Sequence, residues 1–318
     1  WKAGSVFAVN PGAPEIGYVA ANVTGSARLL IGLGWSVVVL TFWPRHRRPM
    51  VVTYGLPLEM TVLLIATLLI LLVLATQSVS LWLSAVLIGL YLWYLWSSSR
   101  GRMAGELEIE GPAALIAALP TPRRRFTVLL LLTYSAAIIV VAAEPFVDGL
   151  IHTGLEMGID EFMLIQWLAP LASEAPEVIV ATLFALRANP VSGIRTLISA
   201  GVNQMTVLIA SMPVVFSLAL GRAHSFPLGS RQLEEFLLTA SFSLFAIVLF
   251  ARMRLAPWHA LILLAFFVAH LFFPDEGQRL VASYILLGLT VFTLAVDPGR
   301  AVVLFSMVRS VLRRGHLE

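Results

Sequence analysis

The sequence has no cysteine, a single lysine and few charged residues of either sign. Asp, Glu, Lys and Arg make up 12% of its 318 residues, against about a quarter in an ordinary soluble domain. The lack of cysteine excludes a disulfide-stabilised scaffold. Apolar residues take the missing share, at 59% hydrophobic with a mean hydropathy of +0.90. This composition excludes a soluble globular enzyme and a disordered chain, and it indicates a polytopic membrane protein.

Long apolar segments follow one another along most of the chain. A helix needs about 20 residues to cross a bilayer, and these segments do not alternate as strands of a membrane barrel do. We therefore expect helices, which pair their own backbone groups in lipid. The expected spans are 16–43, 58–78, 80–97, 126–157, 160–187, 191–220, 232–252, 256–273 and 279–297, with the end of a further helix at 2–9.

The arginines occur in short clusters between the apolar segments. The clusters lie at 45–48, 100–125, 252–254 and 313–314, and alternation of the spans puts all four on one side. By the positive-inside rule this side and the C-terminus are cytoplasmic. We expect an integral protein of a prokaryotic inner membrane. A nucleic-acid partner is not expected, because the basic residues do not form a soluble basic face.

Two segments match at a constant offset along the chain, and they fall on opposite sides of the membrane. We therefore expect an all-α polytopic fold with an inverted repeat, broken helices and a midplane site. The matching positions are Pro14 with Pro190, Gly17 with Gly193 and Gly25 with Gly201. The expected parts are a first half at 1–97 with a repeat remnant at 1–43, a cytoplasmic connector at 98–125, a second half at 126–273 with its repeat at 140–215, and a C-terminal helix with a basic tail at 274–318.

Two acidic residues lie midway along the expected span 160–187. Glu174 and Glu177 are three residues apart and so share one helix face, where each charge costs about 3 kcal/mol or more in lipid. Pro170 and Pro176 should interrupt the helix and free backbone carbonyls. Together these groups are hard oxygen ligands, suited to Na⁺, Ca²⁺ or Mg²⁺. The alternative is a structural kink with two neutral, hydrogen-bonded carboxyl groups.

The run Ser-Glu-Ala-Pro-Glu at 173–177, ahead of Asn189-Pro190 and the segment Gly193–Gln204, resembles the second α-repeat of the cation/Ca²⁺ exchanger superfamily. Sodium/calcium exchangers are its best-known members. Their repeat reads Gly-Thr-Ser-x-Pro-Glu, followed by a helix with Gly-Ser-Asn-x-x-Asn. The resemblance implies ten core helices in two inverted halves, a 5+5 arrangement. It also implies a secondary active antiporter that exchanges a cation, Ca²⁺ for Na⁺ or H⁺, at a midplane carboxylate site without a cofactor. Its partners would be inorganic cations and the lipid bilayer.

The same resemblance implies a ligand set, carried over by position. Glu177 is the acidic ligand, and Gln204 falls where the family has Asn or Asp. Asn203 is either a ligand or a hydrogen-bonding contact between helices. The matching first-repeat acid would lie before Trp1, so we expect the chain to be incomplete at its N-terminus. The implied ligands are Glu177, Glu174, Ser173, Ala172, Gln204 and Asn203.

Arg28 occupies the first-repeat position that corresponds to Gln204. A guanidinium stays protonated in proteins, and a buried one needs a carboxylate partner, so we expect a salt bridge from Arg28 to Glu174. Glu59, at the end of a span, is expected to need no function. Two further hypotheses remain open. Adjacent carboxylates favour a proton-coupled exchanger, because one of them readily holds a proton, and Arg28 favours a transport-inactive membrane scaffold or sensor.

Overall fold

The computed structural model describes residues 15–52, 56–100, 112–158, 161–187, 189–272 and 276–314; the helix end expected at 2–9 lies outside them. The first half of the bundle, residues 15–100, contains α2 (Glu15–Leu29), η1 (Leu30–Gly34), α3 (Trp35–His46), β1 (Met50–Val51), α4 (Pro57–Thr76), β2 (Ser78–Val79) and α5 (Leu81–Arg100). Two helices follow it, α6 (Pro112–Ala117) and α7 (Thr121–Glu156).

The second half, residues 161–272, contains the same kinds of element in the same order after a leading helix. These are α8 (Glu161–Leu186), α9 (Pro190–Asn203), η2 (Gln204–Leu208), α10 (Ile209–Leu220), β3 (Phe226–Pro227), α11 (Ser230–Phe250), β4 (Arg254–Leu255) and α12 (Pro257–His270). Two more helices, α13 (Glu276–Val296) and α14 (Gly299–Arg314), end the described chain.

The expected spans are helical in the structure. Within the described residues, eight helices are long and apolar enough to cross a membrane, and α12 is a shorter apolar helix. The segment expected as a basic tail forms a helix of its own, α14. Its buried residues Leu304 and Met307 are three apart, which is the spacing of one helix face. The tail is therefore packed onto the bundle rather than extended.

The two halves repeat each other at the offset that relates Pro14 to Pro190, as the strand pairs show. Strand β1 pairs with β4, with Met50 opposite Leu255, and β2 pairs with β3, with Val79 opposite Phe226. The same offset carries Met50 onto Phe226 and Val79 onto Leu255. Exchange of the two halves therefore converts each strand pair into the other, as a pseudo-two-fold relation between the halves requires. This relation supports the expected repeat.

The helix irregularities lie elsewhere than expected. We expected Pro170 and Pro176 to break their helix, but α8 runs through both without a break. The irregular turns are the π-helical segments η1 and η2, each inside a long helical rod of one half. Such turns are frequent at functional sites, and these two lie at nearly equivalent places in the repeat.

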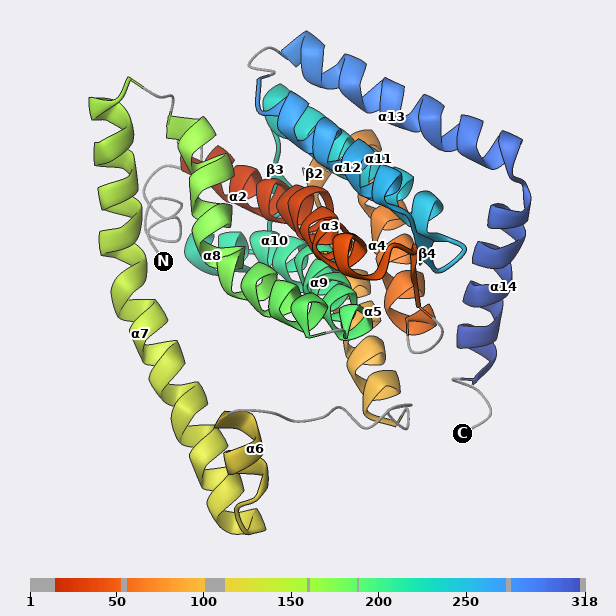
Figure 1. Cartoon of the computed structure of the whole chain (residues 1–318). Coiled ribbons are helices and arrows are strands. Elements are labelled where there is room, and N and C mark those ends of the chain that lie inside the picture. Colours follow the sequence, from red (N-terminus) through yellow and green to blue (C-terminus); the bar gives the residue numbers. More distant parts are fainter. Residues whose placement is uncertain are drawn as a thin grey trace.

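Helix α8 packs between α2 and α9, with a glycine at each contact. A side-chain Cβ at Gly25 of α2 would lie 2.0 Å from the backbone oxygen of Gln166, and one at Gly193 of α9 would lie 2.5 Å from that of Ala181. Only a residue without a Cβ permits such close backbone approach. Figure 1 shows α2, α3, α8 and α9 in the middle of the bundle, with α7 along one edge. This packing sets the acidic face of α8 against its neighbours.

Candidate cation site on α8

A buried carboxylate on α8 forms the centre of the candidate site. Glu174 is 7% exposed, and its Oε1 accepts a hydrogen bond of 2.7 Å from Nε2 of Gln204. Gln204, also buried, is the first residue of η2. The Ser173 hydroxyl donates to the same Oε1 at 3.2 Å. The structure thus brings together three of the residues that the sequence selected.

Ser26 of α2 belongs to the same cluster, and the sequence reasoning missed it. Its hydroxyl lies close to the Glu174 carboxylate, and Glu177 is near enough to act on that carboxylate electrostatically. In the register that pairs Arg28 with Gln204, Ser26 corresponds to Val202, so the repeat gave no signal for it. Ser26 extends the cluster to a third helical rod.

Several oxygen atoms around Glu174 are buried without a hydrogen-bond partner in the described part of the chain. Buried polar atoms are normally satisfied, and an ion is one way in which such atoms find a partner. Oxygen donors are also the ligands that hard cations such as Ca²⁺ prefer. The atoms are Ser26 Oγ, Glu177 Oε2 and Gln204 Oε1.

The remaining expected ligands, Ala172 and Asn203, lie at the edge of this cluster or away from it. Ala172 is exposed on α8. Asn203 is exposed, whereas the next residue, Gln204, is buried. Successive helix residues point about 100° apart, so the two amides do not face the same centre. The structure therefore joins Gln204 to the acidic centre and leaves Asn203 outside it.

The expected salt bridge between Arg28 and Glu174 is wrong. Arg28 of α2 is 1% exposed, and its Nη2 lies 2.5 Å from Oε2 of Glu235 on α11, which is equally buried. Its guanidinium also lies over the Trp167 ring of α8, 5.2 Å from the ring centroid. The packing of α2 against α11 brings a different acid within reach. Within the described residues, Glu174 forms no ion pair with an arginine or lysine.

Glu59, for which we expected no function, is a second buried ion-pair partner. It is 1% exposed near the start of α4, and Nε of Arg195 on α9 donates to its Oε1 at 3.1 Å. The sequence signal was the offset between the repeats, which makes Glu59 the counterpart of Glu235. Equivalent acids in the two halves are thus both held by arginines.

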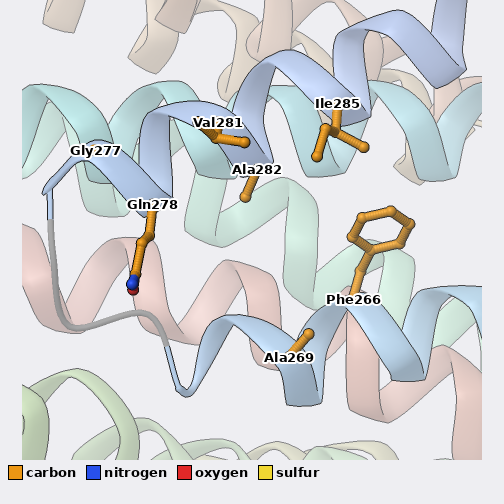
Figure 2. A pocket seen from close by; sticks show the side chains of 7 residues that line it. All are labelled: Phe266, Ala269, Gly277, Gln278, Val281, Ala282 and Ile285. Carbon is orange, nitrogen blue, oxygen red and sulfur yellow. The ribbon is translucent and has the colours of Figure 1, made fainter.

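The cavity in Figure 2 is distinct from this acidic cluster. It has a volume of about 310 Å³ and lies between α12 and α13. Its lining carries no acidic residue, so it lacks the charged ligands that a cation site needs. The cavity is lined by Phe266, Ala269, Gly277, Gln278, Val281, Ala282 and Ile285.

The two carboxylates of Glu174 and Glu177 are too few to surround a cation by themselves. Across the described ranges, no three His, Cys, Asp or Glu residues gather closely enough to hold a metal ion. A cation at Glu174 and Glu177 would therefore need neutral oxygens to complete its ligands. The unpartnered oxygens of Ser26 and Gln204 are of that kind.

The candidate site thus consists of a buried acid on a membrane helix, a second acid one turn further along it, and an amide from the following helical rod. The family model described as "Sodium/calcium exchanger protein" matches residues 3–100 and 127–274, which is most of the chain. The chain belongs to the sodium/calcium exchanger family. This exchanger-family chain is therefore an integral membrane transporter and not an enzyme, and its membership supports cation exchange as the activity.

Solved structures agree with the family assignment. The crystal structure of the H⁺/Ca²⁺ exchanger CAX is 35% identical, with a TM-score of 0.92, and the match covers 100% of this chain and 78% of that chain. The sodium-calcium exchanger NCX_Mj, soaked with 2.5 mM Na⁺ and 10 mM Sr²⁺, is 20% identical, with a TM-score of 0.56 and coverage of 85% and 79%. The second likeness concerns the fold alone. No curated protein shows significant similarity to the exchanger-family chain.

Proposed function

We propose that this chain exchanges Ca²⁺ for protons across the membrane, with the Glu174 cluster as the transported-cation site. The observation that carries the proposal is the buried carboxylate of Glu174, bound by Gln204 at 2.7 Å and flanked by unpartnered oxygens on three helical rods. Glu177 supplies the second carboxylate. Ser26, Ser173 and the backbone carbonyl of Ala172 are further oxygen ligands in this proposal, and Asn203 is not one of them.

Protons are the coupling ions in this proposal because the site carries two neighbouring carboxylates. Like charges at short range favour a proton on one of them, so cation release and proton uptake compete for the same oxygens. The similarity to an H⁺/Ca²⁺ exchanger, which extends over 100% of this chain, supports the same choice. Alternating exposure of the site to the two sides would then carry Ca²⁺ one way and protons the other.

Flux through reconstituted protein tests the proposal. The full chain in liposomes should take up ⁴⁵Ca²⁺ in Na⁺-free buffer when the lumen is acidic, and a protonophore that collapses the pH gradient should stop the uptake. Glu177→Gln and Glu174→Gln should each abolish it. Glu156→Gln is the matched control, because Glu156 is an exposed acid of α7 paired with His152.

The outcomes separate the alternatives. Uptake that needs a Na⁺ gradient and does not respond to the pH gradient would show that the coupling ion is Na⁺ and not the proton. Uptake that survives Glu177→Gln would remove this residue from the site. A folded protein that moves no cation would favour a transport-inactive scaffold or sensor.

We also propose that the Arg-rich loops face the cytoplasm. The β1–β4 pair joins the loop after α3 to the loop after α11, and so gathers two of the arginine clusters at one end of the bundle. The β2–β3 pair joins the loop after α4 to the loop after α10. Arginine enrichment at one membrane side marks the cytoplasmic side.

The absence of cysteine makes this orientation easy to test. In intact cells, a membrane-impermeant maleimide should label His224→Cys and leave Arg48→Cys unlabelled until the membrane is opened, because both residues are exposed on opposite loops. The reverse labelling would invert the proposed topology. The cysteine-free parent chain is the blank.

A further inference from the structure

Arg28 and Gln204 occupy equivalent positions in the two halves of the chain. The offset that relates them also relates the strand pairs residue for residue, so the equivalence does not rest on sequence likeness alone. Both residues are buried, and each lies at or just before the π turn of its rod. Where the second half has an amide at the acidic centre, the first half has a guanidinium.

The two side chains differ in what they offer to a cation. Gln204 donates one N–H to Glu174 and keeps its Oε1 without a partner in the described part of the chain. A guanidinium has five N–H donors, no acceptor and a permanent positive charge. Arg28 therefore cannot ligate a cation, and its charge repels one. In the first half, the position equivalent to Gln204 therefore carries the positive charge of Arg28 in place of a potential ligand.

The charge of Arg28 is balanced inside the bundle. Glu235 lies 2.5 Å away, and Arg279 of α13 contacts Glu235 at 3.5 Å and Glu234 at 3.4 Å. Among the residues that the structure describes, the two arginines and two glutamates of these contacts balance in formal charge. His270 of α12 is close enough to Arg28 for the two to interact electrostatically.

The acids of this cluster differ from those of the candidate site in their partners. Glu234 and Glu235 are engaged by arginines. Glu174 and Glu177 form no ion pair with arginine or lysine in the described ranges. The fold thus pairs Glu234 and Glu235 with its own arginines and leaves Glu174 and Glu177 available.

We propose that Arg28 is a built-in cation, which fills the first-half counterpart of the Gln204 subsite and excludes Na⁺ from it. The proposal rests on the proposed function, because it assigns specificity to the same exchanger. It makes Arg28 a specificity-determining residue: Glu235 is held by a tethered charge, and the mobile cation is left with the Glu174 cluster. Because Glu235 is paired with Arg28, Na⁺ finds no second carboxylate site in addition to the Glu174 cluster.

Direct binding of ²²Na⁺ and ⁴⁵Ca²⁺ to the purified full chain tests this role. Wild type and Arg28→Lys, which keeps the charge, should bind no Na⁺ in competition with Ca²⁺. Arg28→Gln, which makes the two halves alike at this position, should bind about one additional Na⁺ per chain, because Glu235 then keeps only its 3.5 Å contact with Arg279 and the new amide offers an acceptor oxygen. The double variant Arg28→Gln/Glu235→Gln removes both charges and should lose that gain.

Two results would overturn the proposal. One is a folded Arg28→Gln protein, judged by its Ca²⁺-dependent thermal shift, that gains no Na⁺ binding. The other needs no variant at all: Na⁺ that displaces Ca²⁺ from the wild-type chain. Proton-driven ⁴⁵Ca²⁺ flux of the wild type is measured separately, so a failure of the exchange activity is distinguishable from a failure of Na⁺ exclusion.

Discussion

Glu59 and Glu235 are equivalent positions of the two halves, and each is buried in an ion pair with an arginine from the other half of the chain. The carboxylates correspond, but their partners do not. Arg28 is a deeply buried residue of the first half, and Arg195 is a partly exposed residue of the second. Each ion pair therefore links the two halves of the chain. The arginine beside Glu235 is buried, whereas the arginine beside Glu59 is partly exposed.

Removal of the two acids should have unequal costs. Glu235→Gln leaves the guanidinium of Arg28 in a site with 1% exposure, and an unpaired buried charge costs about 3–5 kcal/mol. Glu59→Gln leaves Arg195, whose side chain is 34% exposed and remains partly hydrated, so we expect a loss of about 1 kcal/mol. Thermal unfolding of both variants in the same detergent measures the difference. Equal losses would mean that burial of the arginine does not set the cost.

Gln204 should matter for cation affinity where its neighbour does not. Gln204→Leu removes the 2.7 Å hydrogen bond to Glu174 and a free buried oxygen. A hydrogen bond to a charged group contributes about 1.5–3 kcal/mol, so the apparent Ca²⁺ affinity should fall about tenfold or more. Asn203→Leu is the matched control, because Asn203 is exposed on the same rod. Concentration dependence of ⁴⁵Ca²⁺ uptake gives both values, and a larger effect at Asn203 would contradict the site.

Alanine at two equivalent glycines should have opposite effects on stability. A Cβ at Gly25 would lie 2.0 Å from the backbone oxygen of Gln166, whereas one at Gly201 would meet only Leu63, at 3.9 Å. Overpacking at Gly25 should cost about 3 kcal/mol, and Gly201→Ala should gain about 0.5–1 kcal/mol from helix propensity. The apparent melting temperatures of the two variants test this contrast. A Gly25→Ala protein as stable as wild type would show that α2 and α8 can separate at no cost.

An acid outside the membrane helices should make stability depend on pH. Asp297, between α13 and α14, accepts hydrogen bonds from Arg252 at 2.8 Å and from Arg300 at 3.1 Å, and these hydrogen bonds lower the pKa of its carboxyl group. A lowered pKa gives stability that is present above the unfolded pKa of about 3.9 and is lost as pH falls through the folded value. Wild type should therefore exceed Asp297→Asn in melting temperature at neutral pH and approach it below about pH 4. A difference that does not change with pH would contradict the ion-pair origin.

Much of the fold could be predicted from the sequence because the bilayer imposes a simple rule. A span is a run of apolar residues of fixed length, so the helices at 57–76 and 230–250 were readable without any knowledge of their neighbours. The buried Glu174 was readable for the same reason, since a charge in mid-span must face the protein interior. The continuity of α8 could not be predicted from the sequence. A proline removes one backbone hydrogen bond, and the packing around the helix decides whether the helix stays continuous.

By itself, the sequence determined the kind of helices and their places along the chain, and it predicted the repeat and selected the acidic residues on α8. Only the tertiary structure decided which acid pairs with Arg28, that Ser26 joins the centre and that Asn203 stays outside it. The physical reason is that spacing along a helix gives the relative directions of its own residues, but not the rotation of one helix against another. Glu174 and Glu235 are both acids on membrane helices, and the packing of α2 against α11 brings Arg28 within 2.5 Å of Glu235.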